Sequence, residues 1–105
     1  MNTVKKALYQ DLTQTVNQAI GRKAISVQLL MKTVEEARMI RQMRGLFALI
    51  TYLNQMADQV FTAEEMDILK AHPRRKELVN RIADHLIKEK VITFTESLML
   101  KRMLS

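Results

Sequence analysis

The sequence predicts an all-α fold: a small single domain over residues 1–105, with five helices, one long central helix and a C-terminal three-helix segment. Apolar residues recur at steps of three and four along most of the chain, which is the pattern of amphipathic helices. The chain contains only two Gly and one Pro, so the residues that tight β-turns require are scarce. Hydrophobic residues make up 48% of the chain and charged residues 27%, which indicates a folded protein with one modest core.

The first helix is expected over residues 3–20, followed by a long second helix that completes an N-terminal helical hairpin over residues 1–60. Gly21 supplies a C-cap for the first helix. Apolar residues form one stripe along it: Val4, Leu8, Leu12, Val16, Ala19 and Ile20.

The second helix is expected from Ser26, a suitable N-cap, to about residue 58. Gly45 lies within it and weakens it by about 1 kcal/mol relative to Ala. The apolar face also rotates by roughly 140° between the two halves, at about 100° per residue. A break near Thr33, where Thr33 and Glu36 match a capping box, is the alternative to a continuous helix.

A short phrase of the sequence occurs twice in the C-terminal part and predicts two helix starts. In each copy Thr is the expected N-cap, and an aromatic residue just before it is expected to pack against a Met in the first turn. The two copies are Phe61, Thr62 and Met66, and then Phe94, Thr95 and Met99.

Residues 61–105 are therefore expected to form a three-helix segment. A short acidic helix over residues 63–71 must stop near His72, because the residue before a proline is disfavoured in the α region. Pro73 can begin the next helix, which runs to about Lys90. The last helix is expected over residues 95–104.

The last helix is apolar on nearly all sides, so a second subunit is expected to cover one of its faces. The sequence thus predicts a homodimer. The interface candidates are Leu98, Met99, Leu100, Met103 and Leu104.

Few residues of this chain are suited to catalysis. The chain has no Cys, which fits a reducing cytoplasm, and it has no Gly-rich phosphate loop. Its two His residues, His72 and His85, lie on different predicted elements and are expected to be structural. We therefore expect a non-enzymatic cytoplasmic protein with no cofactor, no metal site and no membrane-spanning segment.

The charge distribution is more informative, because the net charge is +6 and its basic excess lies toward both ends of the chain. Such a balance is typical of a protein that binds nucleic acid or an acidic protein. Arg74, Arg75 and Lys76 stand out, since three cations at a helix start oppose the helix macrodipole. They would suit phosphate contacts. Alternatively, they are neutralised internally by the acidic residues of 64–67.

The predicted DNA-contacting residues form two groups on helix surfaces: Arg74, Arg75, Lys76 and Arg81, and then Arg38, Arg41 and Arg44. For the second group, pairing with carboxylates of another helix is the structural alternative. In their order of elements, residues 62–104 resemble a helix-turn-helix, although the connection before the last helix is longer than the usual turn.

Two functions follow from these patterns. The first is a small regulatory or accessory protein that binds DNA mainly through phosphate contacts. The alternative is a protein-interaction module, such as an adaptor, chaperone or inhibitor, that uses the Met-rich second helix and the apolar last helix.

Overall fold

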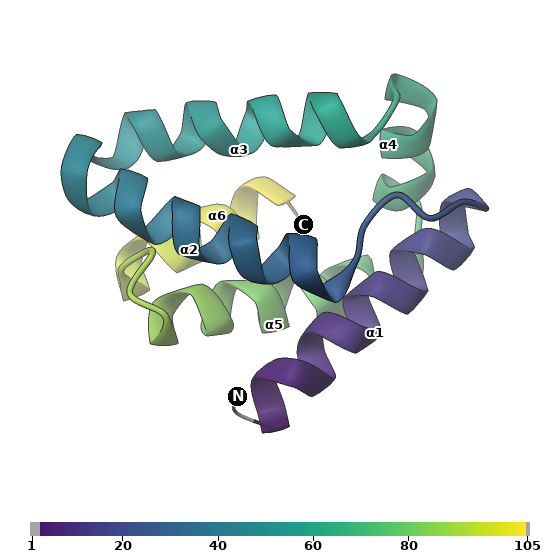
Figure 1. The fold of residues 1–105 in the computed structure, drawn as a ribbon, viewed down its shortest axis with the longest axis horizontal. Helices are drawn as coiled ribbons and strands as arrows, with labels where there is room; N and C mark the ends of the chain where they lie inside the picture. The colour runs from purple at the N-terminus through teal and green to yellow at the C-terminus, as the bar shows by residue number, and fades with distance from the viewer. Residues whose placement is uncertain (1–2, 105) are drawn as a thin grey trace.

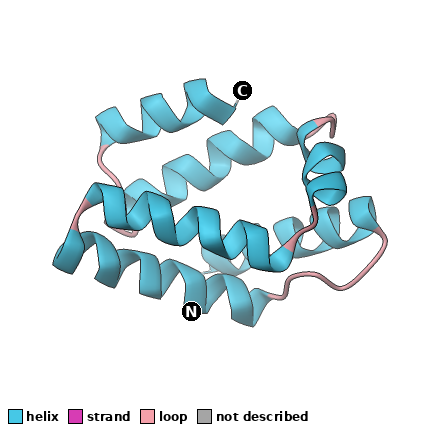
Figure 2. Ribbon diagram, turned by 90° about the horizontal axis from the view of Figure 1, so that it is seen from above, coloured by secondary structure: helices cyan, strands magenta, loops and turns pink. Residues whose placement is uncertain are grey.

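The computed structural model describes residues 3–104, with side chains described within residues 5–102. This part of the chain is entirely helical outside its short connections, which confirms the predicted fold class (Figures 1 and 2). It holds six helices rather than five. They are α1 (Thr3–Ile20), α2 (Val27–Arg44), α3 (Leu46–Val60), α4 (Ala63–Lys70), α5 (Arg75–Lys88) and α6 (Phe94–Leu104). None of these helices has the length and apolar character needed to cross a membrane.

The prediction of one long central helix is wrong, because the chain reverses at Gly45 and forms the α2–α3 hairpin. Gly45 has φ 88° and ψ −173°, a backbone conformation found almost exclusively in glycine. Figure 1 shows α2 and α3 side by side, and Gly45 alone separates them in the sequence. The rotation of the apolar face between the two halves thus reflects two separate helices, and α2 runs through Thr33 without a break.

The connection from α1 to α2 follows from local hydrogen bonds. Gly21 ends α1 with φ 77°, and Ser26 caps α2 by accepting a hydrogen bond from the Leu29 amide at 3.1 Å. Between them, the side chain of Asn17 accepts from the amides of Ala24 and Ile25 at 3.0 and 3.1 Å. The Asn17 side chain therefore binds two of the backbone amides of this loop.

Helices α4 and α6 both start with a capping box of the form Thr-x-x-Glu. At α4, Thr62 accepts from the Glu65 amide, as predicted, and Glu65 accepts from the Thr62 amide. At α6 the predicted cap Thr95 is wrong, because the cap is Thr93, which exchanges the same two bonds with Glu96. The spacing of Thr and Glu decides both starts, whereas the repeated Phe-Thr pair does not.

Helix α5 also starts later than predicted, because Pro73 lies in the turn and Arg74 is the N-cap. Helices α5 and α6 form a second hairpin, whose connection includes the buried Val91. In Figure 2 this hairpin lies alongside α2 and α3. Figure 1 shows α1 running obliquely to them, and it contacts α2, α4 and α5.

The core has two parts, which share α2. In the first part, Leu8, Tyr9 and Leu12 of α1 pack with Leu78 of α5. In the second part, Ala37, Leu49 and Val91 join the α2–α3 hairpin to the end of α5. Burial of a side chain such as Leu49 is worth about 1.5–3 kcal/mol.

Candidate interaction surface

The structure divides the seven predicted DNA-contacting residues into two groups. Four of them form ion pairs with carboxylates of other elements: Arg38, Arg41, Arg74 and Arg81. The other three form no ion pair with any described residue: Arg44, Arg75 and Lys76. The first group would have to break an ion pair to bind a phosphate, whereas the second group would not.

Arg74 uses all of its guanidinium donors within the protein. It donates to both carboxylate oxygens of Asp11 at 2.9 and 2.8 Å and to those of Glu77 at 3.2 and 2.7 Å. A fifth bond goes to the Thr15 hydroxyl at 3.0 Å. Because a guanidinium has five N–H donors, a phosphate would have to displace one of these partners. The internal neutralisation predicted for this residue is present, but its partners are Asp11 and Glu77 rather than the acidic residues of 64–67.

Asp11 is the centre of this network, because Arg81 donates to it as well. The hydrogen bonds from Arg74 and then from Arg81 hold the pKa of Asp11 well below its usual range. Asp11 lies in α1, and both arginines belong to the α5 segment. The network therefore fixes α1 against the start of α5.

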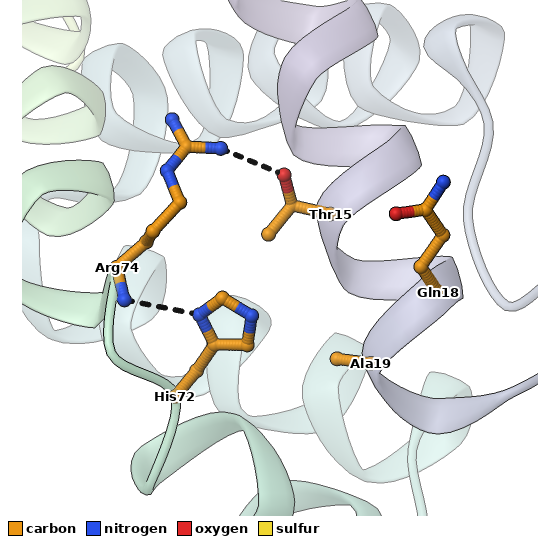
Figure 3. Close-up of a pocket in the computed structure, with 5 residues that line it drawn as sticks. All are labelled: Thr15, Gln18, Ala19, His72 and Arg74. Atoms are coloured by element: carbon orange, nitrogen blue, oxygen red, sulfur yellow. Dashed lines mark hydrogen bonds between the residues drawn. The ribbon is translucent and has the colours of Figure 1, made fainter.

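A shallow hollow of about 390 Å³ lies beside this network, between α1 and the α4–α5 turn. Its lining residues are Thr15, Gln18, Ala19, His72 and Arg74 (Figure 3). The Nδ1 atom of His72 accepts from the Arg74 amide at 3.0 Å, which holds the turn in place. Since the donors of Arg74 are occupied, the hollow offers little to an anion.

The two arginines in the middle of α2 join it to the C-terminal segment. Arg38 donates to the Glu89 carbonyl at 2.7 Å and lies 3.4 Å from its carboxylate. Arg41 donates to Glu96 at 2.8 Å. Both therefore match the structural alternative considered for them.

The capping glutamates Glu65 and Glu96 each hold an arginine as well as a helix start. One oxygen of Glu96 accepts from the Thr93 amide and the other accepts from Arg41. Glu65 accepts from the Thr62 amide and from Arg22, whose bonds to it measure 2.6 and 2.7 Å.

A partly buried polar cluster also joins α1 to the end of α5. The Tyr9 hydroxyl and His85 Nε2 are 2.8 Å apart, and their rings meet edge to face. Burial lowers the pKa of His85 and raises that of Tyr9 to about 12. Glu89 lies next to them and pairs with Lys5 and Arg38.

Two of the three predicted DNA-contacting residues that form no ion pair within the described chain, Arg75 and Lys76, lie at the α4–α5 corner. Arg75 donates to the Lys70 carbonyl at 3.3 Å, and Lys76 is exposed. Neither they nor Lys70 form an ion pair within the described residues. This corner and Arg44 at the end of α2 are therefore the parts of the predicted DNA surface that form no ion pair within the described chain.

The end of the α2–α3 hairpin exposes large apolar side chains on both sides of Gly45. Met43 is 80% exposed and Phe47 is 85% exposed. Met39 and Ile50 lie about one turn further along their helices and are also exposed. Met39 and Met43 belong to the Met-rich second helix that was a predicted interaction face, but the sequence pattern did not single out Phe47. Gly45 is the sequence feature that could have identified Phe47. A reversal of the chain at Gly45 places the residues on both sides of it at the exposed end of a hairpin.

The predicted dimer interface on α6 is partly accessible. Leu98 and Met99 are exposed, and Leu100 is half-buried. Met103 and Leu104 lie outside the residues whose side chains are described. The homodimer stays a prediction.

No protein-family model matches this chain, and comparisons with curated proteins and with solved structures likewise find no match.

Proposed function

We propose that this chain is a non-enzymatic protein-interaction module that binds a partner protein through the end of the α2–α3 hairpin. The observation that carries the proposal is the exposure of Met43 and Phe47 on the two sides of Gly45. Single exposed apolar residues are normal, but neighbouring large ones are typical of a binding surface. Burial of both side chains is worth about 3–6 kcal/mol before the costs of association.

Photo-crosslinking tests this proposal. A benzophenone side chain replaces Phe47, and a control protein carries it at Gln14, an exposed position on α1. In cells that make the protein, crosslinking to a defined partner is expected from position 47 alone. Met43→Ser should weaken that crosslink without changing the circular dichroism of the protein. Equal crosslinking from both positions, or none from position 47, would contradict the proposal.

DNA binding is the second candidate, and the free cations of the α4–α5 corner favour it. Lys70, Arg75 and Lys76 would supply phosphate contacts without breaking an ion pair of the described structure. A gel-shift series at increasing salt is the test. Each phosphate contact contributes about 0.9 to the slope of log affinity against log salt. The double variant Arg75→Gln, Lys76→Gln should therefore flatten the slope by about 2, and an unchanged slope would contradict this candidate.

A further inference from the structure

The end of the α2–α3 hairpin combines apolar surface with positive charge. Residues 37–57 contain no Asp or Glu, and they contain the three arginines Arg38, Arg41 and Arg44. Arg38 and Arg41 are held by carboxylates of the C-terminal segment. Arg44 is exposed and forms no hydrogen bond or ion pair with the rest of the described chain. It is the last residue of α2, between Met43 and Gly45 in the sequence, and the chain reverses at Gly45 toward Phe47.

This arrangement sets a condition on what can cover the hairpin end. Arg44 is exposed and stands between Met43 and Phe47 in the sequence, so a partner that covers both apolar side chains also reduces the access of water to Arg44. A buried charge without a partner costs free energy unless a carboxylate pairs with it. Because Arg44 forms no ion pair with any carboxylate of the described residues, the carboxylate must come from the partner.

A second copy of this chain does not supply that carboxylate. In a two-fold interface the same patch meets itself, and residues 37–57 of the other copy contain no Asp or Glu that could pair with Arg44. Each copy also carries a net charge of +6, so the two copies repel each other over longer distances. An acidic partner experiences attraction from the same charges.

The fold also bears on the backbone conformation of the partner. The described residues form helices and turns, so the surface offers no strand edge that could extend into a sheet. A helix satisfies its own backbone hydrogen bonds and presents apolar and charged side chains along one side. Such a helix suits a surface that consists of exposed side chains.

We infer that the hairpin end docks an acidic amphipathic helix of a partner protein, whose apolar side chains cover Met43 and Phe47 and whose carboxylate pairs with Arg44. This inference rests on the proposed protein-interaction function and adds the chemical class of the partner. Under the DNA-binding hypothesis Arg44 contacts a phosphate, whereas under this inference it pairs with a carboxylate and so favours an acidic helix.

A peptide titration followed by NMR tests the inference. Two synthetic helical peptides of about 18 residues, or about five turns, share one Leu-rich face and differ only in carrying Glu or Lys on the other faces. Methyl signals of Met39 and Met43 report contact with the hairpin end. The Glu peptide should shift both signals saturably and bind about tenfold more tightly than the Lys peptide, with a preference that weakens as salt is added.

Two variants locate the charge selection. Arg44→Glu should reverse the preference between the peptides, and it should fold normally because the exposed Arg44 side chain forms no hydrogen bond or ion pair within the described structure. Arg75→Glu changes the net charge by the same amount at the α4–α5 corner and should keep the original order. Reversal by Arg75→Glu would show a general charge effect and would overturn the inference.

The outcomes separate this inference from the proposed function. If both peptides shift the Met signals with equal affinity, the apolar docking function stands and the acidic partner is wrong. If the Met signals shift with protein concentration in the absence of peptide, a second copy covers the patch and the inference fails. If neither peptide shifts them, both the inference and its premise are contradicted.

Discussion

Replacement of Gly45 by Ala should destabilise the hairpin through its backbone alone. At φ 88° and ψ −173° an L-residue is strained by about 1–3 kcal/mol. A Cβ atom placed on Gly45 meets nothing within 4 Å, so no steric contact adds to this cost. The expected loss in the free energy of unfolding is therefore about 1–3 kcal/mol.

The same substitution favours an alternative conformation. Ala is about 1 kcal/mol better than Gly inside a helix, so Gly45→Ala moves the balance toward one continuous helix over 27–60 by about 2–4 kcal/mol in total. In that conformation α3 leaves the core that Leu49 helps to form. A second molecule can restore those contacts by exchanging α3, which is a domain-swapped dimer.

Urea unfolding and light scattering measure the two effects. With a slope of about 1–3 kcal/mol per molar urea, the Gly45→Ala midpoint should fall by about 1 M. Dimer should also appear at high protein concentration. Gly21→Asn is the matched control, because Gly21 ends α1 at φ 77°, where Asn is the usual second choice. If Gly45→Ala is monomeric and as stable as this control, the account of the hairpin is wrong.

Three further predictions concern the caps and the buried polar groups. Thr93→Ala should cost about 1 kcal/mol of stability, and Thr95→Ala should cost less than about 0.5 kcal/mol in the same urea assay, the reverse of what the repeated Phe-Thr pair suggests. Asp11→Asn should lower the free energy of unfolding by about 1–2 kcal/mol, a modest amount because the side chains of Asp11 and its two arginines are partly exposed. If this loss disappears in 1 M salt, its origin is ionic. Because burial lowers the pKa of His85, the unfolded chain takes up the proton more readily, so stability should be full above about pH 7 and decline as the pH falls below about 6.5. The urea midpoint measured from pH 7.5 to 5.5 should lose most of this slope in His85→Gln.

The sequence predicts features that depend on neighbouring residues better than features that depend on residues far apart in the chain. The caps at Ser26 and Thr62 and the end of α1 at Gly21 depend on a few neighbouring residues, so the pattern identified them. Helix propensity alone gives Gly45 a cost of about 1 kcal/mol relative to Ala, which a long helix can tolerate, so propensity does not predict the reversal. The rotation of the apolar face was the stronger indication, because one straight helix with two faces needs two sets of neighbours.

The ion pairs could not be predicted in the same way. Pairs within a helix follow from spacing, as for Glu77 and Arg81, which lie 3.7 Å apart. The pair between Asp11 and Arg74 joins residues 63 positions apart, and only the packing of α1 against α5 brings them together. Periodicity shows that α1 has a polar side, but it does not show which helix that side meets.

The double role of Glu65 and Glu96 has a consequence for how this chain unfolds. Each carboxylate completes the first turn of a helix and binds an arginine of the N-terminal half of the chain. Fraying of α4 or α6 at its start therefore also releases an arginine from Glu65 or Glu96, and separation of the two halves also removes a cap. Helix formation and tertiary docking are thus thermodynamically linked at both points. We expect the amides of Glu65 and Glu96, which donate to the capping threonines, to be more protected from hydrogen exchange than the first amides of α5, which has no side-chain cap.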